Sequence, residues 1–167
     1  MNTQPIYLAL YRGRRDGSWY HPKVAAARLC DWLIRTLTKS LYSHCELAVR
    51  LSEKNETGAV QYACYSSSIR DGGVRTKPMP LPADKWDLIP VLQSNAYTDT
   101  LKHYAATHGQ RYDWLGAVGV ITHWRDDQHK WFCSEWCAAA LGLAEPEHYS
   151  PAALAGYLRA ALPENGE

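Results

Sequence analysis

The pattern of apolar and polar positions along the chain predicts strands mainly in the first half. An uninterrupted apolar run at residues 6–11 is typical of a buried strand. Residues 43–51 and 59–66 are also strand-like, and the segment between them is rich in turn formers, so we expect a hairpin. Another strand is expected at residues 85–92, where Pro90 marks a sheet edge or a strand end.

Apolar residues at helical spacing, together with capping residues, predict helices mainly in the second half of the chain. Asp113 is a candidate N-cap, and Ser150 with Pro151 forms an N-cap and first-turn pair. Residues 69–82 contain glycines and three prolines and are predicted to be irregular. The predicted helices are residues 23–39, 95–108, 113–121, 133–143 and 152–162. These elements predict an α+β fold, with a small antiparallel sheet packed against helices.

The composition favours one compact domain spanning residues 1–167, because 46% of the residues are hydrophobic. The 18 basic and 17 acidic residues give a net charge of +1, and no long block carries a single sign. This pattern argues against a nucleic-acid or anionic-membrane partner. No apolar segment approaches the roughly 20 residues of a membrane span. The N-terminus lacks a signal-peptide pattern, so we expect the chain to be cytoplasmic as synthesised.

Cys133 is the candidate nucleophile, because it lies where an apolar strand-like stretch turns into a helix. The five cysteines are odd in number and scattered, which favours free thiols over disulfides. At a helix start, unpaired N–H groups and the helix dipole lower a thiol pKa and can hold an oxyanion. The backbone N–H groups of Cys133 and Ser134 are therefore candidate oxyanion-hole donors. Cys137, one turn further along, is predicted to be core, and Cys133 alone could equally be a buried small hydrophobe.

His44 is the candidate base. Strand alternation places His44 and Glu46 on one face, and imidazole titrates near neutral pH. The alternative is a solvated histidine at a strand end. A third polar group usually orients a catalytic imidazole. Glu46 is a possible third member, Tyr65 or Ser66 on the partner strand is an alternative, and the sequence leaves the choice open.

A zinc site is the rival interpretation of the same cysteines. His129, Cys133 and Cys137 are spaced four residues apart, with His123 nearby. Ligands at that spacing drift around a helix, and the chain contains no CxxC or HExxH motif. No phosphate-binding or dinucleotide-binding glycine motif is present either. We therefore expect no metal and no cofactor. Asp71, in a glycine-flanked turn, is interpreted as a turn former.

The order of these motifs resembles the circularly permuted, papain-like branch of the NlpC-type cysteine peptidase superfamily. The motifs are SHCEL around His44, GQRYD at residues 109–113, FCSEW around Cys133 and YSPAAL at residues 149–154. The similarity is strongest to the YiiX-like group, especially its small phage and prophage members, and covers residues 6–158.

The resemblance implies a permuted papain-like fold in which Cys133 is the nucleophile and His44 is its base. Tyr112 matches a tyrosine that borders the active site in this superfamily. The family's third polar residue lies on the strand after the histidine strand. The matching residues 64–68 contain no Glu, Gln, Asn or His, so that role stays open.

The leading functional hypothesis is therefore a thiol hydrolase that cleaves amide bonds in peptides or peptidoglycan. A lipid acyltransferase or thioesterase would use the same Cys133 and His44 pair. A non-catalytic, phage-associated binding protein that retains the fold is the alternative from another class. In a phage setting, the protein would be released at lysis or packaged in the particle. The oligomeric state is not predicted.

Overall fold

The structure is a computed structural model that describes residues 4–13, 22–37, 39–54, 56–113 and 130–163. The described residues form a mixed α+β fold. Its strands are β1 Ile6–Tyr11, β2 His44–Lys54, β3 Val60–Ser68, β4 Gly73–Pro80, β5 Trp86–Pro90, β6 Arg111–Tyr112 and β7 Lys130–Trp131. Its α-helices are α1 Pro22–Leu37, α2 Ala96–Thr107, α4 Cys133–Ala140 and α5 Pro151–Ala160, with a 3-10 turn, η1, at Pro146–His148.

The strands form one sheet in the order β5-β1-β2-β3-β4-β6-β7. All neighbouring pairs are antiparallel except β6 and β7, which are parallel. The predicted hairpin is confirmed as β2 and β3, in which Leu47 pairs with Tyr65. β5 lies at one edge and ends at Pro90, where the missing N–H breaks no ladder inside the sheet.

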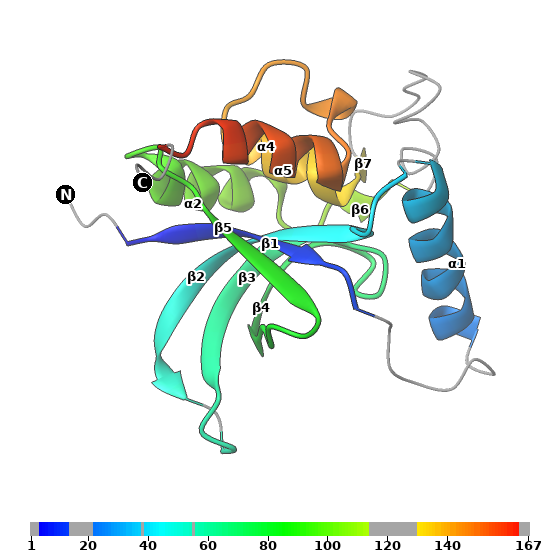
Figure 1. The fold of residues 1–167 in the computed structure, drawn as a ribbon, viewed down its shortest axis with the longest axis horizontal. Helices are drawn as coiled ribbons and strands as arrows, with labels where there is room; N and C mark the ends of the chain where they lie inside the picture. Colours follow the sequence, from blue (N-terminus) through cyan, green and yellow to red (C-terminus); the bar gives the residue numbers. More distant parts are fainter. Residues whose placement is uncertain (1–3, 14–21, 38, 55, 114–129, 164–167) are drawn as a thin grey trace.

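Three helices cover one face of the sheet, while α1 stands to one side (Figure 1). α4 packs on β2 and β3, α2 packs on α4 and β4, and α5 packs on α4, β1 and β5. The main core lies beneath these helices, and its largest fully buried members include Trp136, Phe132, Leu8, Leu10 and Leu47.

The alternation of β2 divides its side chains between two environments. Cys45 and Leu47 belong to the main core under the helices. Ala48 belongs to a smaller apolar cluster on the opposite face. Side chains of a strand alternate between faces, so His44 and Glu46 share the face of Ala48. The alternation expected from the sequence is therefore present in β2.

The prediction that residues 69–82 are irregular is wrong, because β4 occupies Gly73–Pro80 and pairs with β3 along its whole length. The glycines serve the turn that leads into β4. Gly72 has a φ of +85°, and a Cβ on Gly73 would lie 2.0 Å from the carbonyl oxygen of Gln110.

The prolines of β4 fit its outer edge. The N–H of Val74 points away from β3, to the carbonyl of Gln110 at 2.9 Å. Pro78 and Pro80 stand an even number of residues from Val74, so their missing N–H groups lie on the same outer side. β6 pairs with β4 only at Gly73, so no ladder bond is lost at either proline.

The remaining predicted elements agree with the structure within a few residues at their ends. Ser150 caps α5, since its Oγ accepts a hydrogen bond from the Ala153 N–H at 3.1 Å. The helix predicted from Cys133 ends earlier than expected, at Ala140. Residues 114–121 of another predicted helix lie outside the described residues.

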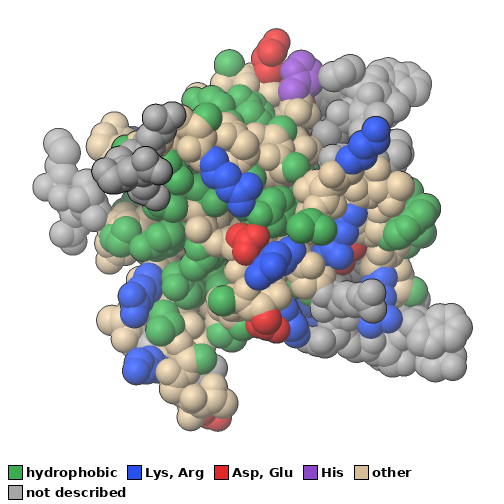
Figure 2. Space-filling view, viewed as in Figure 1, with side chains coloured by type: hydrophobic (Ala, Val, Ile, Leu, Met, Phe, Trp, Pro, Cys, Tyr) green, Lys and Arg blue, Asp and Glu red, His purple; other side chains and the backbone are tan. Residues whose placement is uncertain are grey.

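No described helix is both long enough and apolar enough to cross a membrane. In Figure 2, Lys and Arg side chains are scattered over the face shown, with acidic side chains beside several of them. On this face, charges of both signs are therefore interspersed.

Candidate active site

Cys133 is the first residue of α4, where the chain changes from extended to helical. The preceding residue, Phe132, has φ −82° and ψ 154°, and its carbonyl accepts the first helical hydrogen bond from the Trp136 N–H at 2.9 Å. The Glu135 carboxylate accepts a hydrogen bond from the Phe132 N–H at 3.2 Å. Trp136 anchors this turn, because its indole N–H donates to Thr107 of α2 at 2.9 Å. The helix start is thus fixed at Cys133 by contacts on both sides.

His44, the first residue of β2, joins Cys133 to Glu46. Its Nε2 lies 3.1 Å from Oε1 of Glu46. The imidazole is also hydrogen-bonded to the Cys133 sulfur. Since Nε2 faces the carboxylate, Nδ1 is the ring nitrogen left for the sulfur. Only 8% of His44 is exposed, so both contacts lie largely away from water.

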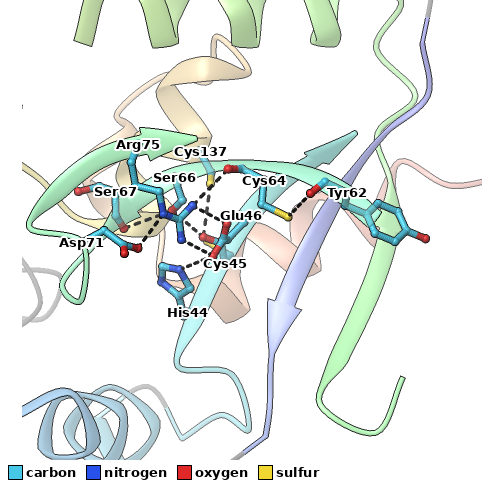
Figure 3. Close-up of polar contacts among 10 residues, drawn as sticks. All are labelled: His44, Cys45, Glu46, Tyr62, Cys64, Ser66, Ser67, Asp71, Arg75 and Cys137. Atoms are coloured by element: carbon cyan, nitrogen blue, oxygen red, sulfur yellow. Dashed lines mark hydrogen bonds and ion pairs between the residues drawn. The ribbon is translucent and has the colours of Figure 1, made fainter. Parts of the chain in front are cut away.

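Arg75 of β4 and Asp71 extend this chain of contacts on the other side of Glu46 (Figure 3). The Arg75 guanidinium binds both oxygens of Glu46, with Nη1 at 2.7 Å from Oε2 and Nη2 at 2.8 Å from Oε1. Its Nε donates to Asp71 at 2.8 Å. Glu46 is only 1% exposed, and a buried carboxylate needs such compensation. The bidentate geometry fixes the Glu46 carboxylate in its position beside His44.

The pKa values follow from this arrangement. Burial by itself raises the pKa of Glu46, but hydrogen bonds and charges from Arg75 and His44 outweigh burial and lower it to about 2. Burial lowers the pKa of His44, but the Cys133 thiolate and then Glu46 outweigh it and raise the pKa to about 9. Burial raises the pKa of Cys133, but hydrogen bonds from Cys45 and the charge and hydrogen bond of His44 bring it well below its ordinary value. These shifts favour a thiolate at Cys133 beside an imidazolium at His44.

Cys45 supports the thiolate from the helix-covered side of β2. Both its thiol and its backbone N–H are hydrogen-bonded to the Cys133 sulfur. The pKa of Cys45 is raised, first by burial and then by its contacts with Cys133 and Cys137, so it stays a neutral donor. Cys137 is completely buried in the core, as predicted, and its sulfur lies 3.8 Å from the Cys45 carbonyl oxygen.

Of the candidates for a third polar group, the structure brings Glu46 to His44. Tyr65 lies on the other face of the sheet and packs edge-on against Tyr104, with ring centroids 5.3 Å apart. The Ser66 hydroxyl donates to the Cys45 carbonyl at 2.8 Å. The carboxylate thus lies on the histidine strand itself, two residues after His44.

The other predicted site residues lie close to the start of α4. Tyr112 of β6 is buried, and its ring packs against Phe132 at 6.1 Å between centroids. The Ser134 hydroxyl donates to the carbonyl of Tyr149, which ties the first turn of α4 to the segment before α5. Asp71 lies in the turn between β3 and β4, as predicted, and has the additional role of binding Arg75.

Arg75 is the charged residue of this site that sequence reasoning missed. It lies in the segment that was predicted to be irregular, where no side chain could be assigned to a face. One signal was available, because a glutamate on the inward face of a buried strand needs a cationic partner. Arg75 is a nearby candidate for that role, separated from Glu46 by a single strand of the sheet.

Cys133 has no exposed surface. A pocket of about 360 Å³ opens beside the site, and its wall includes His44 and Glu46 but not Cys133. A reagent that enters this pocket meets the imidazole before the sulfur, so neighbouring groups must move before a substrate can reach Cys133.

Within the ranges that the structure describes, no group of three or more His, Cys, Asp or Glu side chains could hold a metal ion. His123 and His129, which belong to the zinc alternative, lie outside those ranges. No protein-family model matches the chain. A search of curated proteins gives no match either.

Proposed function

We propose that this protein is a cysteine hydrolase that cleaves amide bonds, with Cys133 as the nucleophile and His44 as its acid and base. The supporting observation is the position of His44, hydrogen-bonded to the Cys133 sulfur on one side and to the Glu46 carboxylate on the other. A buried thiol, an imidazole and an orienting carboxylate are the parts that nucleophilic thiol catalysis requires. Glu46 holds the imidazole, and Arg75 holds Glu46.

In the proposed reaction, the Cys133 thiolate attacks the acyl carbon of an amide, and a C–S bond forms as the carbonyl electron pair moves to oxygen. The backbone N–H groups of Cys133 and Ser134, at the positive end of α4, are proposed to stabilise that oxyanion. The imidazolium of His44 donates its proton to the leaving nitrogen as the C–N bond breaks. Water then attacks the thioester while His44 accepts a proton from it, and C–S cleavage regenerates the thiolate and imidazolium.

The substrate class rests on the resemblance to permuted papain-like NlpC-type peptidases, which implies peptides of the peptidoglycan type. The order of site residues along the chain, with the histidine strand before the cysteine helix, supports that fold assignment. The charged side chains on the wall of the pocket beside His44 favour a peptide over a lipid acyl chain, because they would be poorly compatible with a long hydrocarbon.

The experiment is incubation of the protein with purified peptidoglycan or soluble muropeptides, followed by mass analysis of the released products. We expect new amine termini from the native protein and none from the Cys133→Ala variant. Acid quenching should trap the thioester intermediate, which mass analysis would detect as the mass of the acyl group added to Cys133. Equal release by both proteins would refute the proposal.

The complete burial of Cys133 favours one second candidate, a binding protein that retains the fold without catalysis. The two functions differ in the reactivity of the sulfur towards iodoacetamide at neutral pH. An accessible thiolate alkylates rapidly, whereas a permanently closed site does not. Alkylation of Cys133 at the rate of an unfolded control peptide, or faster, would support the hydrolase. A rate lower by several orders of magnitude would support the binding protein.

A further inference from the structure

The pocket beside His44 carries more positive than negative side chains. Its wall includes His44 and the basic residues Arg70, Arg75, Lys77 and Lys85, against the acidic residues Glu46 and Asp71. The open side of the site is therefore electropositive, although the chain as a whole is nearly neutral. Walls of low dielectric concentrate such a field inside a cleft.

The ion pairs of the site compensate only part of the positive charge on the pocket wall. Arg75 is compensated from within, because its guanidinium binds Glu46 through two nitrogens and Asp71 through the third. Arg70 and Lys77 are both exposed, and neither is in an ion pair within the described part of the chain. Both can therefore turn towards a ligand at little cost.

Part of the pocket wall is apolar. The rings of Tyr11 and Trp86 lie 5.0 Å apart at 58°, and Met79, Pro80 and Pro82 complete this wall. A ligand that fits both the basic and the apolar parts of this lining has an anionic group and a short apolar or amide stem. At about 360 Å³ the pocket is large enough for one or two amino-acid residues but not for a folded partner.

We propose that Arg70 and Lys77 bind a carboxylate of the substrate in this pocket, so that the enzyme acts on acidic peptides at a bond next to a carboxylate-bearing residue. The inference rests on the proposed function for its view of the pocket as a substrate site. The pairing is chemically direct, because an arginine fork and an ammonium are the usual protein partners of a carboxylate. His44 on the same wall would place the bound residue beside the reacting groups.

The test uses binding alone and therefore does not depend on catalysis. N-acetylglutamate and its neutral isostere N-acetylglutamine are titrated into the native protein, and the ring signals of His44 are followed by NMR. We expect N-acetylglutamate to bind at least tenfold more tightly, and we expect the preference to weaken at high salt. Inorganic phosphate, titrated separately, should bind more weakly than N-acetylglutamate.

The matched variants are Arg70→Gln and Lys77→Gln, with Lys102→Gln on α2 as the exposed control. Each pocket variant should weaken N-acetylglutamate binding by about three- to tenfold and leave N-acetylglutamine unchanged, and the control should change neither. Equal binding of the two ligands, tighter binding of phosphate, or an equal effect of the control would each overturn the carboxylate site.

If the carboxylate binds but no amide is cleaved, the hydrolase is refuted and the pocket stands. If cleavage does not discriminate glutamate from glutamine, the pocket is refuted and the hydrolase stands.

Discussion

The two faces of β2 are stabilised in different ways, although the residues of the two faces are neighbours in the sequence. On the helix-covered face, Cys45 and Leu47 are fully buried in an apolar core, where packing supplies the stability. On the other face, His44 and Glu46 are almost as buried, yet their pKa shifts favour the ionised forms, with His44 in contact with Glu46 and Glu46 bound by Arg75. Burial alone therefore does not indicate whether a side chain is charged. The groups that contact a buried side chain determine whether it is ionised or packs as part of an apolar core.

Cys133 lies where the two faces meet, and groups from both faces contact its sulfur. The thiol and N–H of Cys45 reach its sulfur from the apolar side, and the imidazole of His44 reaches it from the charged side. Burial raises the pKa of Cys64 and of Cys45, and neither thiol has an imidazolium partner that outweighs burial. The difference lies in the partners of Cys133, because hydrogen bonds from Cys45 and the charge of His44 lower its pKa where burial alone would raise it.

Removal of the Arg75 cation should have the largest effect on the charged face of β2. Arg75→Gln leaves Glu46 buried without its bidentate partner, so we expect a loss of about 3–5 kcal/mol in the free energy of unfolding. Urea denaturation measures the effect. Asp71→Asn is the matched control, because its carboxylate is partly exposed and should contribute at most about 1 kcal/mol. Similar losses for both variants would show that the Glu46 pair has no special role.

Acid should destabilise the ion pairs on the charged face of β2 before it affects the packing of the apolar face. The pKa of Glu46 is lowered from 4.5 to about 2, so its stabilisation is complete above pH 4.5 and is lost as the pH falls through 2. The shift corresponds to about 3 kcal/mol. His44 is protonated in both the folded and unfolded states throughout this window, so it adds no slope.

Urea unfolding between pH 5.5 and 2 measures this linkage. Cys133→Ala removes the contribution of the thiol, whose lowered pKa acts in the same direction, and Glu46→Gln removes that of the carboxylate. We expect a much flatter dependence on pH for Glu46→Gln than for the native protein. A native-like slope in Glu46→Gln would assign the acid sensitivity to other groups.

Much of this site follows from local patterns in the sequence. His44 and Glu46 on one face of a strand, and Cys133 at the start of a helix, need only alternation and helix periodicity. The choice of Glu46 over Tyr65 needed the strand register, because that register places Tyr65 opposite Leu47, on the covered face.

Arg75 escaped prediction for a physical reason. The prolines of β4 are tolerated because they lie along an edge where they pair with no described strand other than β3, and edge position is a property of the assembled sheet. A local pattern of glycines and prolines favours a loop, and only the pairing with β3 overrides it. The burial of Cys133 is likewise a tertiary property that no local pattern carries.

The reactivity of Cys133 should depend less on pH than that of an ordinary thiol. An ordinary thiol becomes roughly 100-fold more reactive towards iodoacetamide between pH 6 and pH 8, because its thiolate fraction rises with pH. The pKa of Cys133 is well below its ordinary value, so we expect a far smaller ratio of the two rates in the native protein. His44→Gln removes the imidazolium and should restore a steep ratio. A ratio cancels differences in access to the sulfur, and a steep ratio in the native protein would contradict the ion pair.

The smallest effects compare two cysteines that are equally buried on opposite faces. Cys137 lies in the main core under α4, whereas Cys64 lies in the smaller cluster beside the charged residues. Both have no exposed surface, and replacement by alanine deletes one sulfur in each case. We expect Cys137→Ala to cost about 1–2 kcal/mol in the free energy of unfolding and Cys64→Ala less, because the smaller cluster can relax towards the open pocket.

Neither variant should change the pH ratio of Cys133 alkylation by more than about twofold, since neither sulfur is hydrogen-bonded to that of Cys133. A larger loss for Cys64→Ala would mean that the charged face is packed as tightly as the helix-covered one, and that the ion pairs are held by packing as much as by charge.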